Sequence, residues 1–153
     1  MNKFMARAKE NAENGIRANE GGPFGAVIVD KNSNIIADGH NQVLSLNDPT
    51  AHAEINAIRA ACKKLKTYDL SNYILYTSCE PCPMCLSAII WSNIKEVYYG
   101  CSKEDASKIG FKDKIIYDYL NNTNSTLIEL NQIDRNECIK TFEKYKQNNG
   151  IIY

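Results

Sequence analysis

The chain has 153 residues, a length that suits one domain, and 44% of them are hydrophobic, which is enough for a single sizeable core. Its 18 lysine and arginine residues equal its 18 aspartate and glutamate residues, so the totals lack the basic surplus typical of nucleic-acid-binding proteins. The sequence contains no apolar run near the ~20 residues of a membrane span, and its polar first stretch does not have the form of a signal peptide. We therefore expect a cytoplasmic protein whose cysteines are reduced or bind metal.

The first part of the chain predicts a helix followed by a hairpin. Apolar side chains recur at every fourth position of residues 2–18, which predicts an amphipathic helix. The β-rich runs 26–29 and 35–37 flank a turn, and this arrangement predicts two antiparallel strands.

A second helix is predicted after the polar loop 39–48. Pro49 and Thr50 are start signals for this helix, and apolar residues then recur at helical spacing. His52 and Glu54 lie in its first turn, before the apolar stripe begins.

A third strand, predicted over residues 73–76, leads directly into a cluster of cysteines. The three thiols of this cluster belong to Cys79, Cys82 and Cys85. Pro81 and Pro83 are tolerated at the start of a helix but not in its interior, so a helix is expected to begin there and to run through Trp91. This helix is apolar almost all round, which predicts deep burial.

The remaining chain predicts shorter elements, namely a strand at 96–99, a helix at 115–120, a polar linker at 121–125, a fifth strand at 127–130 and a last helix from Asp134. The alternation of helices and strands predicts an α/β fold, a three-layer α/β/α sandwich around a five-stranded mixed sheet. We find no internal repeat, and we expect residues 1–153 to form a single domain.

His52, Glu54, Cys82 and Cys85 together offer the parts of a catalytic zinc site. Zinc binds thiolate and imidazole, and a catalytic site keeps one coordination position open. Both ligand groups lie at predicted helix starts, where the helix dipole favours thiolates. Glu54 is too near to His52 to be a fellow ligand, but it can take a proton from a water that zinc acidifies. We expect one Zn²⁺ per chain, held by His52, Cys82 and Cys85, with Glu54 as the catalytic base.

Three other interpretations of the cluster stay open at this point. Cys79 could close a structural zinc site of four protein ligands, although a residue at a strand end is expected to point away from the helix start. An iron–sulfur cluster of the bacterial type requires a cysteine where this chain has Ile89. The thiols could also be inert core residues, although three of them within seven residues and beside two prolines argue against this.

These motifs resemble those of the cytidine deaminase-like family of zinc hydrolases. The pattern H-x-E followed by P-C-x-x-C is the signature of zinc nucleobase deaminases. The resemblance is carried by residues 22–26, Asn41, residues 48–54 and residues 77–85. It implies the cytidine deaminase-like fold and a zinc-dependent aminohydrolase. The family includes tRNA adenosine, cytosine and guanine deaminases, so these motifs do not choose a substrate.

The second half of the chain is similar to bacterial guanine deaminases within this family. Residues 109–113 resemble their Gly-Phe-x-Asp segment, and the short tail ending in Tyr153 resembles theirs. This resemblance implies deamination of a free purine base, guanine, to xanthine and ammonia. It also implies a domain-swapped homodimer in which the C-terminal segment crosses to the partner subunit. The last helix is nearly balanced in charge, unlike the basic C-terminal helix usual in the tRNA-acting relatives.

The resemblance implies four substrate-binding residues. Asn41 hydrogen-bonds the base, Phe24 stacks on it, Asp113 reads the 2-amino edge of guanine, and Tyr153 covers the site. Without the resemblance they are a turn residue, a core aromatic, a solvated acid and a frayed terminus, respectively. The expected partners are a small-molecule nucleobase and a second copy of the chain, not nucleic acid or membrane. Deamination of another base or nucleoside, or of adenosine in tRNA, and a non-catalytic zinc module remain alternatives.

Overall fold

The computed structural model describes residues 1–121 and 127–152, which belong to two compact units, 1–117 and 118–153. The first unit contains the sheet and all but one of the expected site residues. The exception, Tyr153, lies outside the described residues, as does most of the predicted linker. Within the described residues, every helix falls short of the length and apolar character that a membrane-spanning helix needs.

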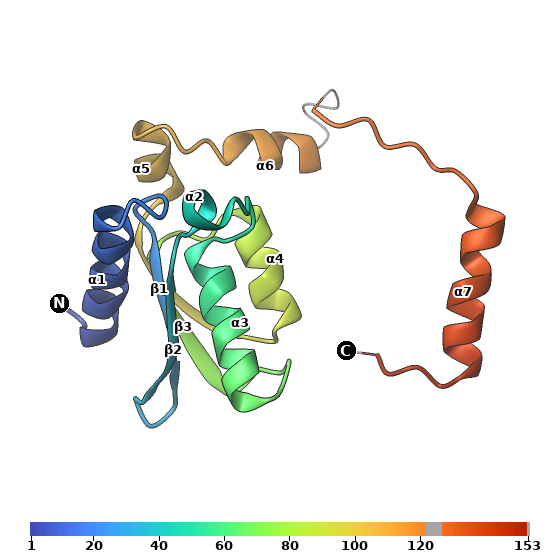
Figure 1. Ribbon diagram of the computed structural model, residues 1–153, viewed down its shortest axis with the longest axis horizontal. Helices are drawn as coiled ribbons and strands as arrows, with labels where there is room; N and C mark the ends of the chain where they lie inside the picture. Colours follow the sequence, from blue (N-terminus) through green and yellow to red (C-terminus); the bar gives the residue numbers. More distant parts are fainter. Residues whose placement is uncertain (122–126, 153) are drawn as a thin grey trace. The chain divides into compact units, whose positions relative to one another are not determined.

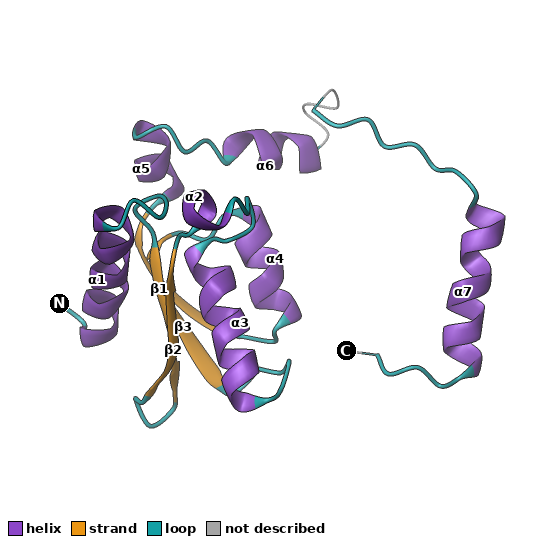
Figure 2. Ribbon diagram, viewed as in Figure 1, coloured by secondary structure: helices purple, strands orange, loops and turns teal. Residues whose placement is uncertain are grey.

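The first unit is built on a mixed sheet of β1 (Gly25–Asp30), β2 (Ile35–His40), β3 (Tyr73–Cys79) and β4 (Glu96–Cys101), in the order β2-β1-β3-β4 (Figure 2). β1 pairs antiparallel with both β2 and β3, whereas β3 and β4 are parallel. The predicted hairpin and the mixed character of the sheet are therefore confirmed.

Helices cover both faces of this sheet and form the predicted three layers (Figure 1). α1 (Lys3–Arg17) packs on one face, and α3 (Ala53–Leu65) and α4 (Pro83–Trp91) lie on the other. β1 is buried on both faces because Val27 faces the α1 layer while its neighbour Ile28 faces the α3 layer.

Two short helices occupy stretches for which the sequence pattern predicts no helix. α2 (Val43–Leu46) lies in the predicted polar loop, and α5 (Lys103–Lys108) follows β4. The start of α5 carries a capping box, in which Ser102 and Asp105 satisfy each other's backbone N–H groups. α6 (Lys114–Leu120) confirms the helix predicted at 115–120.

The prediction of a fifth strand is wrong. Residues 127–130 form neither a helix nor a strand, and in the described part of the chain they pair with no other strand. Their side chains are exposed, with Leu130 at 79%. A β-rich run becomes a strand only where a neighbouring strand supplies the ladder hydrogen bonds. These residues belong to the second unit, in which the described residues beyond α6 form one regular element, α7 (Arg135–Gln147).

The prediction of deep burial for α4 is also wrong. Cys85 and Ile89 are buried against the rest of the unit, but Leu86, Ile90 and Trp91 are exposed, Trp91 at 69%. One side of α4 packs on its neighbours in the first unit, and the described residues of this unit leave the opposite apolar side exposed.

Candidate active site

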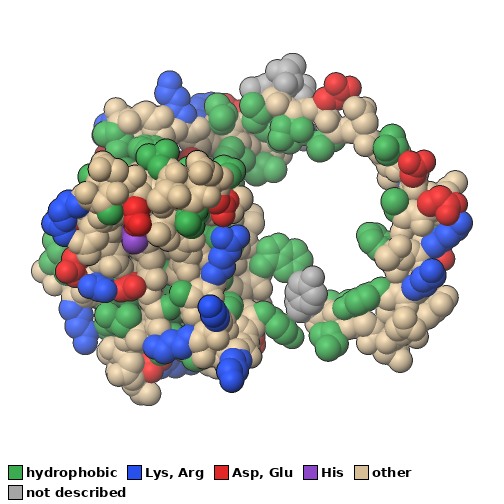
Figure 3. Space-filling model, viewed as in Figure 1, with side chains coloured by type: hydrophobic (Ala, Val, Ile, Leu, Met, Phe, Trp, Pro, Cys, Tyr) green, Lys and Arg blue, Asp and Glu red, His purple; other side chains and the backbone are tan. Residues whose placement is uncertain are grey.

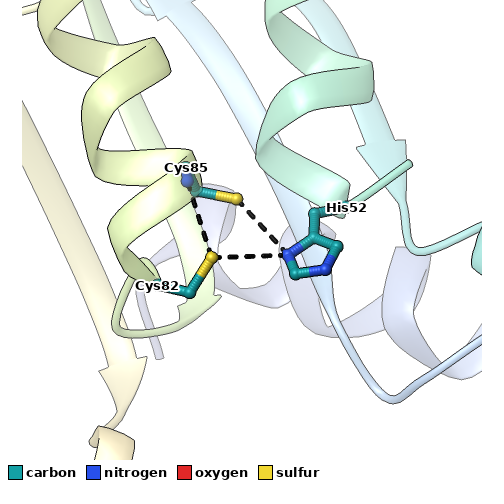
Figure 4. Close-up of side chains that lie close together, drawn as sticks. All are labelled: His52, Cys82 and Cys85. Atoms are coloured by element: carbon teal, nitrogen blue, oxygen red, sulfur yellow. Dashed lines mark hydrogen bonds between the residues drawn. The ribbon is translucent and has the colours of Figure 1, made fainter. Parts of the chain in front are cut away.

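Three candidate metal ligands meet where α3 and α4 begin (Figure 4). His52 is the N-cap residue of α3, Cys82 is the N-cap residue of α4, and Cys85 lies in the first turn of α4. The Nδ1 atom of His52 is 3.5 Å from each of the two Sγ atoms. All three donor atoms lie within 4.8 Å of one another, which is close enough to share one ion.

The donor set fits zinc. One imidazole nitrogen and two thiolate sulfurs are the ligands that zinc prefers, whereas magnesium and calcium prefer oxygen. Three protein ligands also leave the fourth tetrahedral position open, as in catalytic zinc sites. The two cysteines are buried, whereas the histidine is partly exposed.

The electrostatics of the set favour a bound cation. The pKa of Cys82 is lowered to about 4, chiefly by the hydrogen bond from Cys85 and then by the one from His52. The contact between His52 and Cys82 raises the pKa of His52. The contact between Cys85 and Cys82 likewise raises the pKa of Cys85. The two thiols therefore oppose each other's ionisation when they share no cation. A divalent cation supplies the positive charge that lets both thiols ionise.

Cys79 is separate from this set. It ends β3, its Sγ lies 3.7 Å from the carbonyl oxygen of Ser102, and burial raises its pKa to about 12. In the described part of the chain, the group of side chains able to hold a metal ion does not include Cys79. This geometry does not support a closed site with Cys79 as fourth ligand.

Glu54 stands beside the ligands in the first turn of α3. Its side chain is buried, and this desolvation raises its pKa because the charged form loses water. Thr77 donates a hydrogen bond to Oε1 at 3.2 Å, and the thiol of Cys85 lies 3.4 Å from Oε2. A carboxyl with a raised pKa can both accept and release a proton near neutral pH.

A cavity of about 410 Å³ opens onto these residues. Of the residues predicted from the sequence, it is lined by Phe24, Asn41, His52, Glu54, Cys82 and Asp113. The structure therefore brings together residues that are 89 positions apart in the chain, from 24 to 113. Cys85 is fully buried behind the cavity wall, and the position of Tyr153 remains a prediction.

Asn41 has its amide held in one orientation. Its Oδ1 accepts hydrogen bonds from the backbone N–H groups of Gly22 and Val43, both at 3.2 Å. Asn41 is only 4% exposed. Among the described residues, every fully buried side-chain nitrogen or oxygen has a hydrogen-bond partner. Asn41 also lines the cavity, and because its oxygen is engaged by the backbone, its Nδ2 group is the part of the amide that remains to donate to a ligand.

An aromatic pair and an acid form another part of the cavity lining. Phe24 and Phe111 meet edge to face, with ring centroids 4.9 Å apart. Asp113 lies in the same lining, and partial burial raises its pKa. The cavity thus combines an apolar surface with an amide donor and a carboxylate acceptor, as ligand pockets commonly do.

Sequence reasoning gave no role in the site to several residues that the structure places there. Phe111 and Glu80 line the cavity, and Thr77 contacts Glu54. The alternation of side chains along β3 is a signal for Thr77, because residues 77 and 79 face the same side of a strand. Phe111 belongs to the Gly-Phe-x-Asp segment that carries the resemblance, but the segment itself does not predict that its ring approaches Phe24.

Comparison with known proteins agrees with this geometry. The family described as "Cytidine and deoxycytidylate deaminase zinc-binding region" matches residues 1–101. Guanine deaminase of Bacillus subtilis is 48% identical over 144 residues, which cover 94% of this chain and 92% of that protein. A tRNA-specific adenosine deaminase of Buchnera aphidicola is 40% identical over 146 residues, which cover 95% and 89%, respectively.

The X-ray structure of guanine deaminase from Bacillus subtilis has the same fold, with a TM-score of 0.90 at 47% identity. The match covers 96% of this chain and 95% of that chain. The fold is therefore the cytidine deaminase-like α/β fold, as predicted, with four strands in the described sheet. Together with its imidazole and thiol donor set, these matches show that the chain belongs to the zinc-dependent cytidine and deoxycytidylate deaminase family.

Proposed function

We propose that this protein is a zinc-dependent aminohydrolase that converts guanine and water to xanthine and ammonia. The observation that carries the proposal is that the donor set, the Glu54 carboxylate and a base-sized cavity open onto one another. The similarity to a guanine deaminase over nearly the whole chain supports the choice of substrate.

His52, Cys82 and Cys85 would hold the zinc ion. When bound there, zinc supplies a Lewis acid that lowers the pKa of a water molecule. Glu54 takes a proton from the attacking water and gives it to a ring nitrogen of guanine. It then takes the proton of the hydroxyl that has added to the ring carbon and gives it to the amino group, which leaves as ammonia while that carbon becomes a carbonyl. The burial of Glu54 suits both steps, because a raised pKa lets one carboxyl act as base and as acid.

The cavity offers polar groups that complement guanine. The Nδ2 group of Asn41 donates to an acceptor on the base, and the Asp113 carboxylate accepts from its N–H edge. Phe24 supplies an aromatic surface for stacking. Guanine presents both acceptors and donors around its rings, so both polar groups find partners. A free base also suits a chain whose charges balance, because a tRNA backbone favours a basic surface.

We also propose a homodimer in which residues 118–153 cross to the partner subunit. This second unit is shorter than the roughly 40 residues below which isolated domains need other support, and α7 has no buried residue. Apolar side chains lie along one side of α7 and charged ones along the other (Figure 3). Phe142 is 72% exposed, so this apolar side requires a covering surface.

The uncovered apolar side of α4 offers that surface on a second copy. Leu86, Ile90 and Trp91 are exposed there, and the α4 start carries the cysteine ligands. A swapped tail would thereby place Tyr153 near the partner's cavity.

All six cysteines are free in the structure, which suits a reducing compartment, and on this ground we infer a cytoplasmic location.

The substrate assignment predicts ammonia release by the zinc-loaded protein from guanine, and not from adenine, cytosine, cytidine or tRNA, when these are assayed in parallel. The variant Glu54→Ala is expected to bind zinc at one ion per chain and to lose turnover by about 100-fold or more, because the proton carrier is gone. Release from another member of the panel would overturn the choice of guanine. Full turnover by the variant would remove Glu54 from the mechanism.

The orientation of Asn41 predicts the effect of Asn41→Asp. This change keeps Oδ1 for Gly22 and Val43 but replaces the donor with a second acceptor. We expect kcat/KM for guanine to fall about 100-fold or more, because an acceptor of the base then meets a carboxylate. Gln42→Glu adds the same charge at the next residue, outside the cavity lining, and is expected to stay within about threefold. Unchanged kcat/KM in Asn41→Asp would exclude Asn41 from base recognition.

The swapped dimer predicts that Phe142→Glu yields monomers in size-exclusion chromatography with light scattering. A carboxylate on the apolar side of α7 would have to be buried unpaired in the interface. Lys144→Glu adds the same side chain two positions on, on the opposite side of the helix, and is expected to leave the dimer intact. A wild-type chain that is monomeric, or a Phe142→Glu variant that remains dimeric, contradicts the proposed interface.

A further inference from the structure

The Glu54 carboxylate is contacted by side chains from two different elements. Thr77 on β3 donates from Oγ1 to Oε1 at 3.2 Å, and Cys85 on α4 donates from its thiol to Oε2 at 3.4 Å. One oxygen therefore faces the sheet, and the other lies beside the donor set.

These two contacts come from side chains of different kinds. Cys85 belongs to the group of side chains able to hold a metal ion, whereas Thr77 does not. The bond from the Thr77 hydroxyl is therefore the contact of the Glu54 carboxylate that is independent of the donor set.

Thr77 is held rigidly. β3 lies between β1 and β4, and Thr77 is in register with Ala26 on one side and Tyr99 on the other. Its side chain is 1% exposed, and a β-branched side chain in a strand has restricted rotation about χ1. Valine has nearly the same shape and suits a buried strand equally well, so packing alone does not account for a hydroxyl at this position.

We propose that Thr77 is a positioning residue of this active site. Its hydroxyl anchors Oε1 of Glu54, so that Oε2 stays beside the ligands as the atom that receives and delivers protons. The terminal torsion of a glutamate side chain is otherwise broad, and one fixed oxygen removes that freedom. This inference rests on the proposed function, because it takes Glu54 as the proton carrier.

Replacing Thr77 with valine tests the anchor, because Thr77→Val removes the hydroxyl and keeps the shape. We expect kcat for guanine to fall about 10- to 100-fold, since a misplaced base transfers protons slowly. KM should stay within about twofold, since the residues proposed to bind the base are unchanged. Zinc content and the midpoint of thermal unfolding should match the wild type. Thr77→Ser, which restores the hydroxyl, should recover most of kcat.

Two control variants separate this proposal from simpler explanations. Ser92→Ala removes another buried hydroxyl, one that donates to the carbonyl oxygen of Ile89 near the end of α4, and it should leave kcat unchanged. Glu54→Gln tests the proton carrier itself. An active Glu54→Gln contradicts the proposed function, whereas an inactive Glu54→Gln beside a fully active Thr77→Val contradicts only the role of Thr77.

Other outcomes also decide the question. If Thr77→Ser is as slow as Thr77→Val, or if activity is lost in proportion to zinc or to folded protein, Thr77 has a structural role and the proposal is wrong. Should Thr77→Val not fold, Thr77→Ser and Thr77→Ala are compared instead. Equal kcat in these two variants overturns the proposal, and a higher kcat in the serine variant supports it.

Discussion

The close approach of the first turns of α3 and α4 is the constraint on which the rest of the structure depends. It brings the Nδ1 atom of His52 within 3.5 Å of the two cysteine sulfurs. Small residues make the approach of α3 to the sheet possible. Ala53 and Ala57 are fully buried, and a Cβ added to Gly39 on β2 would lie 2.8 Å from the carbonyl oxygen of Ala53. The core thus sets the distance between the ligands, and a bulkier residue at this contact would move His52.

The direction of the strands explains why the cavity lies at one edge of the sheet. β1 runs antiparallel to its two neighbours, so its beginning lies beside the ends of β2 and β3. Phe24 precedes β1, Asn41 follows β2, Glu80 follows β3, and the segment after β4 leads to Asp113. In α/β sheets, ligands commonly bind outside the strand ends, where loops can vary without changing the core. Here the starts of α3 and α4 carry the residues proposed to move protons and hold the metal, and the segments next to the strand ends carry the residues proposed to contact the base.

Much of the site could be predicted from the sequence because its chemistry is local. The histidine and the glutamate are two residues apart, the two cysteines are three apart, and prolines and N-cap positions mark both helix starts. Three other site residues lie far from these motifs in the chain, namely Asn41, Phe24 and Asp113. Before the structure was considered, only the family resemblance assigned them to the same site. Thr77 begins the segment 77–85 that carries the resemblance, but its bond to Glu54 could not be predicted from that segment, because the bond depends on how far α3 lies from β3.

The two incorrect predictions have a common physical origin. Hydrophobic patterns show that a segment needs a covering surface, but not which surface supplies it. α4 is apolar all round, yet Trp91 is exposed, and residues 127–130 are β-rich, yet they form no strand in the described structure. Both segments carry apolar side chains that are exposed in the described part of the chain. A second copy of the chain accounts for α4 in the dimer proposed above.

X-ray absorption spectroscopy at the zinc edge of the loaded protein tests the central claim most directly. An open catalytic site predicts two sulfur ligands at about 2.3 Å and two lighter ligands at about 2.0–2.1 Å, from His52 and a solvent molecule. Cys79→Ser should leave that spectrum unchanged, because Cys79 lies outside the donor set. Three sulfur ligands in the wild type, reduced to two in Cys79→Ser, would show a closed structural site and contradict the proposed catalysis.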